Sequence, residues 1–105
     1  MAKALLVVRS QVTDPSLREK FDTWYSKDHL PWAMKVFKSE KCWRFWSDTD
    51  KGAHIAVYQF ADMGRLTKAM ASAEFKELVA DYDRTWTAGV TRTREIVTLA
   101  EEMIG

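Results

Sequence analysis

The pattern of apolar and polar residues in the first part of the chain predicts one strand followed by one amphipathic helix. Residues 4–8, ALLVV, form a short apolar run that is β-branched towards its end, which predicts a buried strand continuing towards Ser10. Leu17, Phe21 and Trp24 then recur at helical spacing and make one apolar stripe. The DP pair at 14–15 is a typical helix start, because the aspartate can cap the helix and the proline suits its first position.

The end of this first helix is expected near Asp28. Pro31 disfavours helical geometry at the residue before it, so the stretch FDTWYSKDHLP at 21–31 should be the end of a helix. The apolar residues of WAMKVF at 32–37 predict a short second turn or helix after the proline.

The middle of the chain has the pattern of a β-hairpin. KCWRFWS at 41–47 is rich in aromatic residues, and GAHIAVYQF at 52–60 is β-prone. The segment DTDKG at 48–52 lies between the two runs and supplies Asp and Gly for a turn.

A second helical region and a last strand complete the chain. Asp62 is placed to cap a helix over 63–70, and a break is expected at Ser72. After this break the apolar residues follow the i, i+3, i+4, i+7, i+11 spacing of a helix, at Phe75, Leu78, Val79, Tyr82 and Trp86. Gly89 should end this helix, VTRTREIVTLA at 90–100 should be the final strand, and 101–105 should be a tail.

The order of elements, β-α-β-β-α-β, is that of the ferredoxin-like α+β fold, with helices on one face of a four-stranded antiparallel sheet. The length of 105 residues fits a single domain over 1–105. Both faces of the hairpin carry large apolar groups: Tyr58 and Phe60 share one face of their strand with His54, while Ile55 and Val57 share the other. A sheet with one helical layer and two apolar faces needs a second cover, so we expect a homodimer whose sheets pack face to face.

Composition and charge exclude several classes of protein. The chain is 47% hydrophobic and 30% charged with a formal net charge of +1, which gives no broad field for nucleic acid or a membrane surface. The apolar run at 4–8 is too short for a signal peptide or a membrane span, and the single Cys42 forms no internal disulfide. We expect a cytoplasmic protein.

The order of elements and the motif WYSKDHLP at 24–31 together resemble the dimeric α+β barrel superfamily and, within it, the EthD-like family. The motif places Trp24 and Tyr25 before an acidic residue, Asp28, and the run His29-Leu30-Pro31, and ASAEF at 71–75 is similar to a small-residue turn of the same family. The resemblance implies a small, largely apolar ligand. Relatives in the superfamily differ in chemistry, and include oxygenases, isomerases and cyclases.

Tyr25 and His29 are the main candidates for chemistry, with His54 as a possible second acid or base. Tyr25 and His29 lie one helical turn apart on the same side of the first helix, where both can meet one ligand. In the alternative interpretation His29 interacts with the C-terminal end of the helix dipole and Tyr25 is a packing group. His54, with Tyr58 on the same face, reaches the site only if that face looks towards the helices; otherwise it is a solvated residue beside the hairpin turn.

The residues expected to contact a ligand are Trp24, Trp32, Trp46, Tyr58, Phe60 and Arg44. Trp32, just after the proline, should form the lip of the pocket. Arg44 can pair with a carboxylate or phenolate of the ligand, or with an acidic group in the dimer. Arg92 and Arg94 alternate on the last strand and should form a solvated or interfacial face.

No phosphate-binding loop, metal-ligand pair or nucleophile–base motif occurs, so no cofactor and no metal are expected. The sequence therefore favours an enzyme that acts on a small apolar or aromatic compound by cofactor-free acid/base chemistry, of isomerase, cyclase, dehydratase or lyase type. Two alternatives stay open. One is a non-catalytic protein that holds a hydrophobic ligand, and the other is a monooxygenase, either haem-dependent or cofactor-free.

Overall fold

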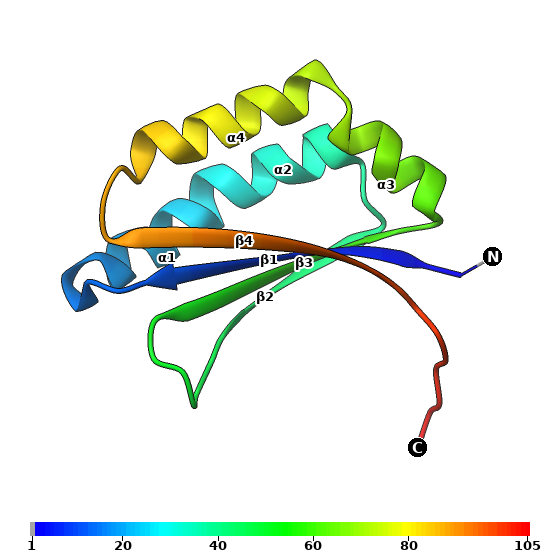
Figure 1. Cartoon of the computed structure of the whole chain (residues 1–105), viewed down its shortest axis with the longest axis horizontal. Helices are drawn as coiled ribbons and strands as arrows, with labels where there is room; N and C mark the ends of the chain where they lie inside the picture. Colours follow the sequence, from blue (N-terminus) through cyan, green and yellow to red (C-terminus); the bar gives the residue numbers. More distant parts are fainter. Residues whose placement is uncertain (1) are drawn as a thin grey trace.

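The chain forms a four-stranded antiparallel sheet with helices on one face, in a computed structural model that describes residues 2–105 (Figure 1). The elements are β1 (Ala4–Val12), the 3-10 turn η1 (Pro15–Leu17), α1 (Arg18–Trp24), the π-helical turn η2 (Tyr25–His29), α2 (Leu30–Phe37), β2 (Lys41–Trp46), β3 (Ala53–Phe60), α3 (Met63–Met70), α4 (Ala73–Thr85) and β4 (Val90–Thr98). The strand order is β2-β3-β1-β4, which confirms the predicted ferredoxin-like α+β fold.

The start of the first helix follows the expected capping pattern. The side chain of Asp14 accepts a hydrogen bond from the backbone N–H of Ser16 at 2.9 Å, and Pro15 occupies the first position. The helix begins as a 3-10 turn and then becomes α-helical at Arg18.

The expected end of this helix near Asp28 is wrong, because α1, η2 and α2 form one continuous helix up to Phe37. The backbone N–H of Leu30 donates to the carbonyl of Tyr25, five residues back, so the chain makes one wide π-helical turn just before Pro31. Pro31 then lies in the first turn of α2, directly after the π-helical turn. The wide turn lets the helix pass a proline that would otherwise break it.

The second helical region is divided where the sequence predicts. Asp62 accepts from the backbone N–H of Arg65 at 2.9 Å and caps α3, and Ser72 accepts from that of Phe75 at 3.1 Å and caps α4. The end of α4 comes earlier than expected: Trp86 has left helical geometry, and Gly89 instead supplies a positive φ of 78° in the turn before β4.

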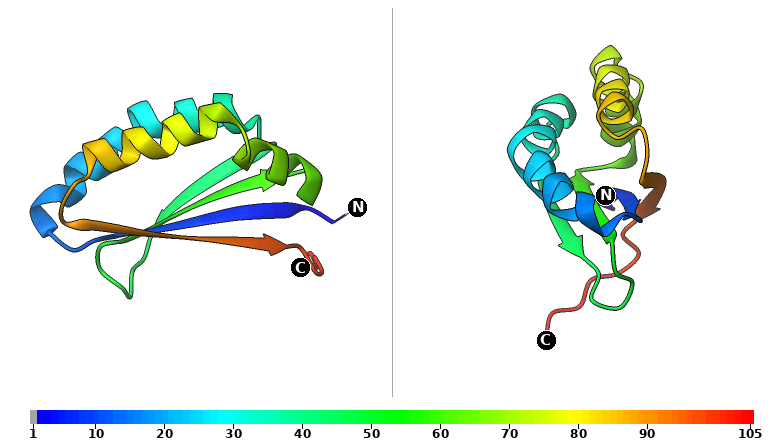
Figure 2. Two further views of the ribbon diagram at one scale, coloured as in Figure 1. Left: turned by 45° about the horizontal axis from the view of Figure 1, so that its top comes forward. Right: turned by 90° about the vertical axis from the view of Figure 1, so that its left-hand side faces the viewer.

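The core lies between the helical layer and the inner face of the sheet (Figure 2). Phe21 and Tyr25 from the long helix, and Leu78 and Tyr82 from α4, are its main helical members. On β3, the face that carries His54, Ala56, Tyr58 and Phe60 looks towards the helices and is buried. This is the arrangement required for His54 to approach a site between the layers.

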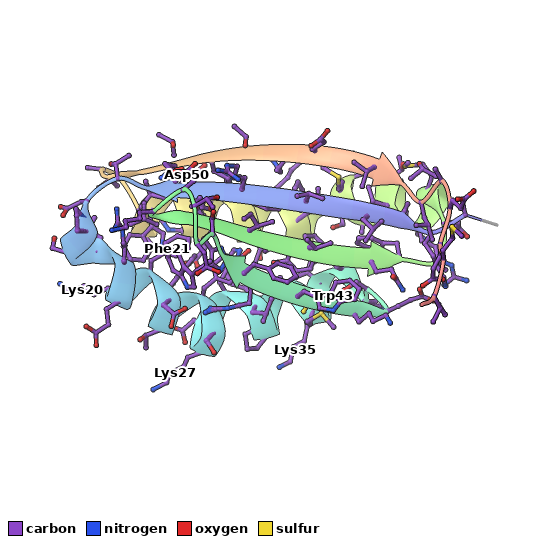
Figure 3. The ribbon with its side chains drawn as sticks, turned by 90° about the horizontal axis from the view of Figure 1, so that it is seen from below. Lys20, Phe21, Lys27, Lys35, Trp43 and Asp50 are labelled. Carbon is purple, nitrogen blue, oxygen red and sulfur yellow. The ribbon has the colours of Figure 1, made fainter. Side chains whose placement is uncertain are left out.

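The outer face of the sheet carries an apolar strip on β2 and β3 that no other segment of residues 2–105 covers. Figure 3 views this face and shows Trp43 on β2. Trp43 is opposite Val57 and Phe45 is opposite Ile55, and these two aromatic side chains are 37% and 50% exposed. An apolar strip of this kind across two strands is typical of a surface that packs against another molecule. Within residues 2–105, no helix is long and apolar enough to cross a bilayer.

Candidate active site

A small cavity lies between the helical layer and the inner face of the sheet. Its polar lining residues are Tyr25, His29, Tyr58, Tyr82, Arg92 and Arg94. The remaining wall consists of aliphatic and aromatic side chains from β1, α2 and α4. The cavity has a volume of about 30 Å³, room for a water or two, so an aromatic ring enters it only if side chains move.

The π-helical turn brings Tyr25 and His29 to this cavity together. Residues four apart lie nearly in line along such a turn, and the two ring centroids are 4.8 Å apart. Both side chains are buried. Their proximity confirms the spacing argument, although the turn that produces it is not the expected helix end.

His29 is held as a neutral imidazole in an aromatic setting. The indole of Trp24 stacks on it at 4.7 Å between ring centroids, and its Nδ1 is buried without a hydrogen-bond partner among residues 2–105. Burial, followed by the positive charge of Arg92 and the proximity of His54, lowers the pKa of His29 to about 4. His29 therefore has an unprotonated ring nitrogen at neutral pH. The alternative role at a helix C-terminus is wrong, since the helix continues to Phe37.

Two pairs of hydroxyl groups flank the cavity. The hydroxyl oxygens of Tyr25 and Tyr58 are 3.0 Å apart, and those of Ser10 and Tyr82 are 2.7 Å apart. Burial raises the pKa of all three tyrosines, so each is a neutral phenol. A bond between two hydroxyls uses one of their two protons, so each pair retains one O–H that can donate to a ligand.

Arg92 and Arg94 lie at the rim of the cavity; Arg94 is exposed, in keeping with the expected solvated face, and Arg92 is half-buried. In the β1–β4 register Arg92 is opposite Ser10 and Arg94 is opposite Val8, so both point to the helical side. The Arg92 guanidinium lies 4.1 Å from the ring centroid of Tyr82 and donates to Asp83 at 3.1 Å. The guanidinium groups therefore place positive charge where the cavity meets solvent.

His54 is fully buried on the inner face of the sheet, so it is not the solvated residue of the alternative interpretation. Its ring centroid is 4.5 Å from that of Tyr25 and 5.0 Å from that of Trp46. Burial and the charge of Arg44, opposed by Asp22, lower its pKa to about 4. His54 does not line the cavity. The ring of Tyr25 lies between the two histidines and contacts both His29 and His54.

Arg44 and Trp46 meet an acidic residue of their own chain. Arg44 forms an ion pair with Asp22, and the indole N–H of Trp46 donates to the same carboxylate at 2.7 Å. The hydrogen bond from Trp46, and then the contact with Arg44, lower the pKa of Asp22. The two side chains thus fasten β2 to α1, and the expected ligand contact at Arg44 is replaced by this internal pair.

The other expected ligand contacts lie outside the cavity. Trp24 supports His29 by stacking, Trp32 borders a shallow depression beside Glu74 on the surface, and Phe60 faces a separate groove at the end of the sheet. Of the residues expected at the site, only Tyr25, His29 and Tyr58 line the cavity. Sequence reasoning missed Tyr82 and the two arginines at the rim. The sequence feature that could have indicated Tyr82 is its hydroxyl group, which stands in an otherwise apolar helical stripe.

The residues present do not suggest a metal or haem site. No group of three or more His, Cys, Asp or Glu side chains is placed to hold a metal ion in the part of the chain from 2 to 105. At about 30 Å³ the cavity as it stands holds neither a haem nor an aromatic ring, and a haem needs a far larger movement of side chains than a single ring does.

No family model and no curated protein matches the sequence, whereas several solved structures share the fold. The cofactor-independent oxygenase SnoaB from Streptomyces nogalater superposes with a TM-score of 0.73 at 11% identity, over 96% of each chain. The ActVA-Orf6 monooxygenase from Streptomyces coelicolor, in complex with nanaomycin D, gives 0.74 at 12% identity, over 99% of this chain and 93% of that one. An EthD family protein from Bacillus halodurans gives 0.65 at 20% identity, over 98% and 100%.

These similarities extend over the whole fold. The chain shares the ferredoxin-like α+β fold of these structures, and an EthD family protein is among its structural neighbours. The resemblance suggested by the motif at 24–31 is thereby confirmed at the level of fold.

Proposed function

We propose that this protein is a small-molecule enzyme that removes a proton from an acidic hydroxyl group of an aromatic or enolic compound. The observation that carries the proposal is the neutral, buried His29, which lies in an apolar cavity between tyrosine hydroxyls and has Arg92 at the rim. A neutral imidazole, donors of hydrogen bonds and a cation are the groups needed to form and hold an anion of this kind.

In the proposed first step a ring nitrogen of His29 takes the proton of the substrate hydroxyl. The O–H bond breaks, an N–H bond forms on the imidazole, and the electron pair stays on the substrate oxygen. Arg92 then balances the negative charge, and the spare O–H of the Tyr25–Tyr58 pair can donate to a second substrate oxygen. Burial first, and then the charge of Arg92, disfavours protonated His29 in the free protein. The substrate anion forms next to the imidazolium and pairs with it, which opposes both effects in the complex.

The anion has two possible fates. If the proton returns at a different atom, the result is isomerisation. If the anion instead attacks a carbonyl of the same molecule, a ring closes and His29 returns the proton to the carbonyl oxygen; loss of that hydroxyl as water is then a dehydration. All of these are acid/base reactions favoured by the sequence. If the anion reacts with O₂, a CH₂ group of the substrate becomes a carbonyl. One oxygen atom enters the product, and the other leaves as water with the two hydrogens and two electrons that the CH₂ group gives up. Two neighbours of the same fold are described as a cofactor-independent oxygenase and a monooxygenase, and this supports the reaction with O₂ as the alternative for this chain.

We also propose that the working form is a homodimer. The apolar strip around Trp43 and Phe45 on the outer face supports it, because a second copy is the simplest partner that covers this surface. The cavity opens on the opposite, helical side of the sheet, so packing of two outer faces leaves it free.

The experiment that tests this function is a turnover screen of phenols, naphthols and hydroxyquinones, with O₂ uptake and product mass measured together. His29→Gln and Arg92→Gln should each lower turnover by about 10² or more. Arg84→Gln, on the exposed side of α4, is the matched control for charge and should retain activity. Unchanged turnover in His29→Gln contradicts the proposed role. Tight binding without turnover of any compound indicates a ligand-binding protein instead.

A further inference from the structure

A second and larger hollow lies at the opposite end of the helical layer from α1. The end of α2, the end of β3 and α3 meet there (Figure 1). We call this hollow the α2–α3 groove. Its volume is about 620 Å³, against about 30 Å³ for the cavity at His29. The groove therefore offers the space for a ring system that the cavity lacks.

The α2–α3 groove combines an apolar floor with a basic rim. Val36, Phe60 and Ala69 contribute to the floor. Lys38, Arg65 and Lys68 supply the cations that border it.

The acidic residue at the rim does not neutralise the positive charge of the rim lysines. The single acidic member of the rim, Glu40, is already bound by Lys3 at 2.8 Å and by Gln59 at 3.0 Å. Within residues 2–105, Lys38 and Lys68 form no ion pair. An apolar surface bordered by free cations is complementary to a molecule with an apolar body and an anionic end.

Phe37 lines both the groove and the cavity. Its ring centroid is 4.9 Å from that of Tyr58 and 5.8 Å from that of Phe75, which line the cavity, and 5.9 Å from that of Phe60 in the groove. Phe37 is the last residue of α2, and the next residue, Lys38, already has left-handed geometry. Phe37 therefore stands at a helix end, between the two hollows.

We propose that the ligand which reaches His29 extends past Phe37 into the α2–α3 groove, where Lys38 and Lys68 hold its anionic end. This inference rests on the proposed function and narrows the substrate to an elongated aromatic compound with a carboxylate or similar anion remote from the reacting hydroxyl. Phe37 then determines specificity, because its position sets how long a compound the combined site accepts.

Two dyes with the same ring system test the role of the groove. Anilinonaphthalene sulfonate is anionic, N-phenylnaphthylamine is neutral, and both gain fluorescence in apolar sites. The double variant Lys38→Glu/Lys68→Glu should weaken binding of the sulfonate about tenfold and change that of the neutral dye by less than about twofold. The control Lys20→Glu/Lys27→Glu makes the same change of charge on side chains that point away from the sheet (Figure 3) and should leave both affinities within about twofold.

Equal effects on the two dyes, or an equal loss in the control, overturn the assignment of the groove. A changed mass of the groove variant in light scattering also overturns it, because it shows that a second copy covers the groove. Thermal melts verify that each variant is folded.

The link between the two hollows is tested by nuclear magnetic resonance of the His29 ring nitrogens. Saturating sulfonate dye should shift the His29 signals in the unaltered protein. The shift should persist in Phe37→Leu and disappear in Phe37→Trp, whose larger side chain takes up more of the space between the two hollows while the dye still binds the groove. Unmoved His29 signals in the unaltered protein overturn the proposal. None of these readouts needs turnover, so failure of the proposed reaction and failure of this extended site are distinguishable.

Discussion

The two buried histidines should make the protein sensitive to mild acid, and His54→Phe should remove about half of that sensitivity. Burial holds the pKa of His29 and of His54 at about 4, below the ordinary value of 6.5. Between these values the unfolded chain binds protons that the folded chain does not, so the free energy of unfolding falls as the pH drops. From pH 7 to pH 5 the loss is about 2 kcal/mol for each histidine.

In His54→Phe only His29 still takes up a proton on unfolding. The free energy of unfolding should therefore fall by about 2 kcal/mol between pH 7 and pH 5, instead of about 4 kcal/mol. Asp22, whose pKa is lowered from 3.8, loses its charge below this range and does not interfere. The assay is urea unfolding, followed by tryptophan fluorescence, at pH 7 and pH 5 and at one protein concentration. His29→Phe is the partner variant and should remove the other half. A loss in His54→Phe as large as in the unaltered protein refutes the reasoning.

Two further predictions concern the sheet and one of its turns. The double variant Trp43→Lys/Phe45→Lys should be a monomer in light scattering, whereas the unaltered protein should be a dimer. A monomeric mass for the unaltered protein contradicts the proposed dimer. Gly52→Ala should lower the free energy of unfolding by about 2 kcal/mol or more, because φ is +84° and a Cβ would lie 2.4 Å from the carbonyl oxygen of Val12. Gly64→Ala, inside α3, is the control and should cost less than Gly52→Ala in the same denaturant titration, because its φ is not positive and its Cβ would meet only the side-chain oxygen of Asp62, at 3.3 Å.

Local sequence patterns predicted most of the fold. The caps predicted at Asp14 and Asp62 depend on residues two or three positions apart, and both are found. The break expected at Ser72 is also found, and there the serine caps α4. The expected helix end near Asp28 failed because the rule for proline assumes a regular α-helix. The π-helical turn before Pro31 removes that assumption, and no short-range pattern in the sequence marks it.

The candidate site was predictable where it depends on local spacing. Tyr25 and His29 are four residues apart on one helix, so their meeting followed from the sequence. Arg92 and Tyr82 come together only through the register of β1 with β4 and the packing of α4, which single-sequence patterns do not determine. Arg44 was assigned to the ligand for a similar reason, since its partner Asp22 lies on a different element.

The most direct test of the central claim is the ionisation of a phenol bound beside His29 and Arg92. Para-nitrophenol is a suitable probe because its anion is coloured, so a pH titration with and without protein gives the pKa of the bound hydroxyl. The account predicts a lower pKa for the bound phenol than for the free one, and loss of this shift in Arg92→Gln. An unshifted pKa, or an equal shift in Arg92→Gln, would contradict the claim that this cavity stabilises the anion of its substrate.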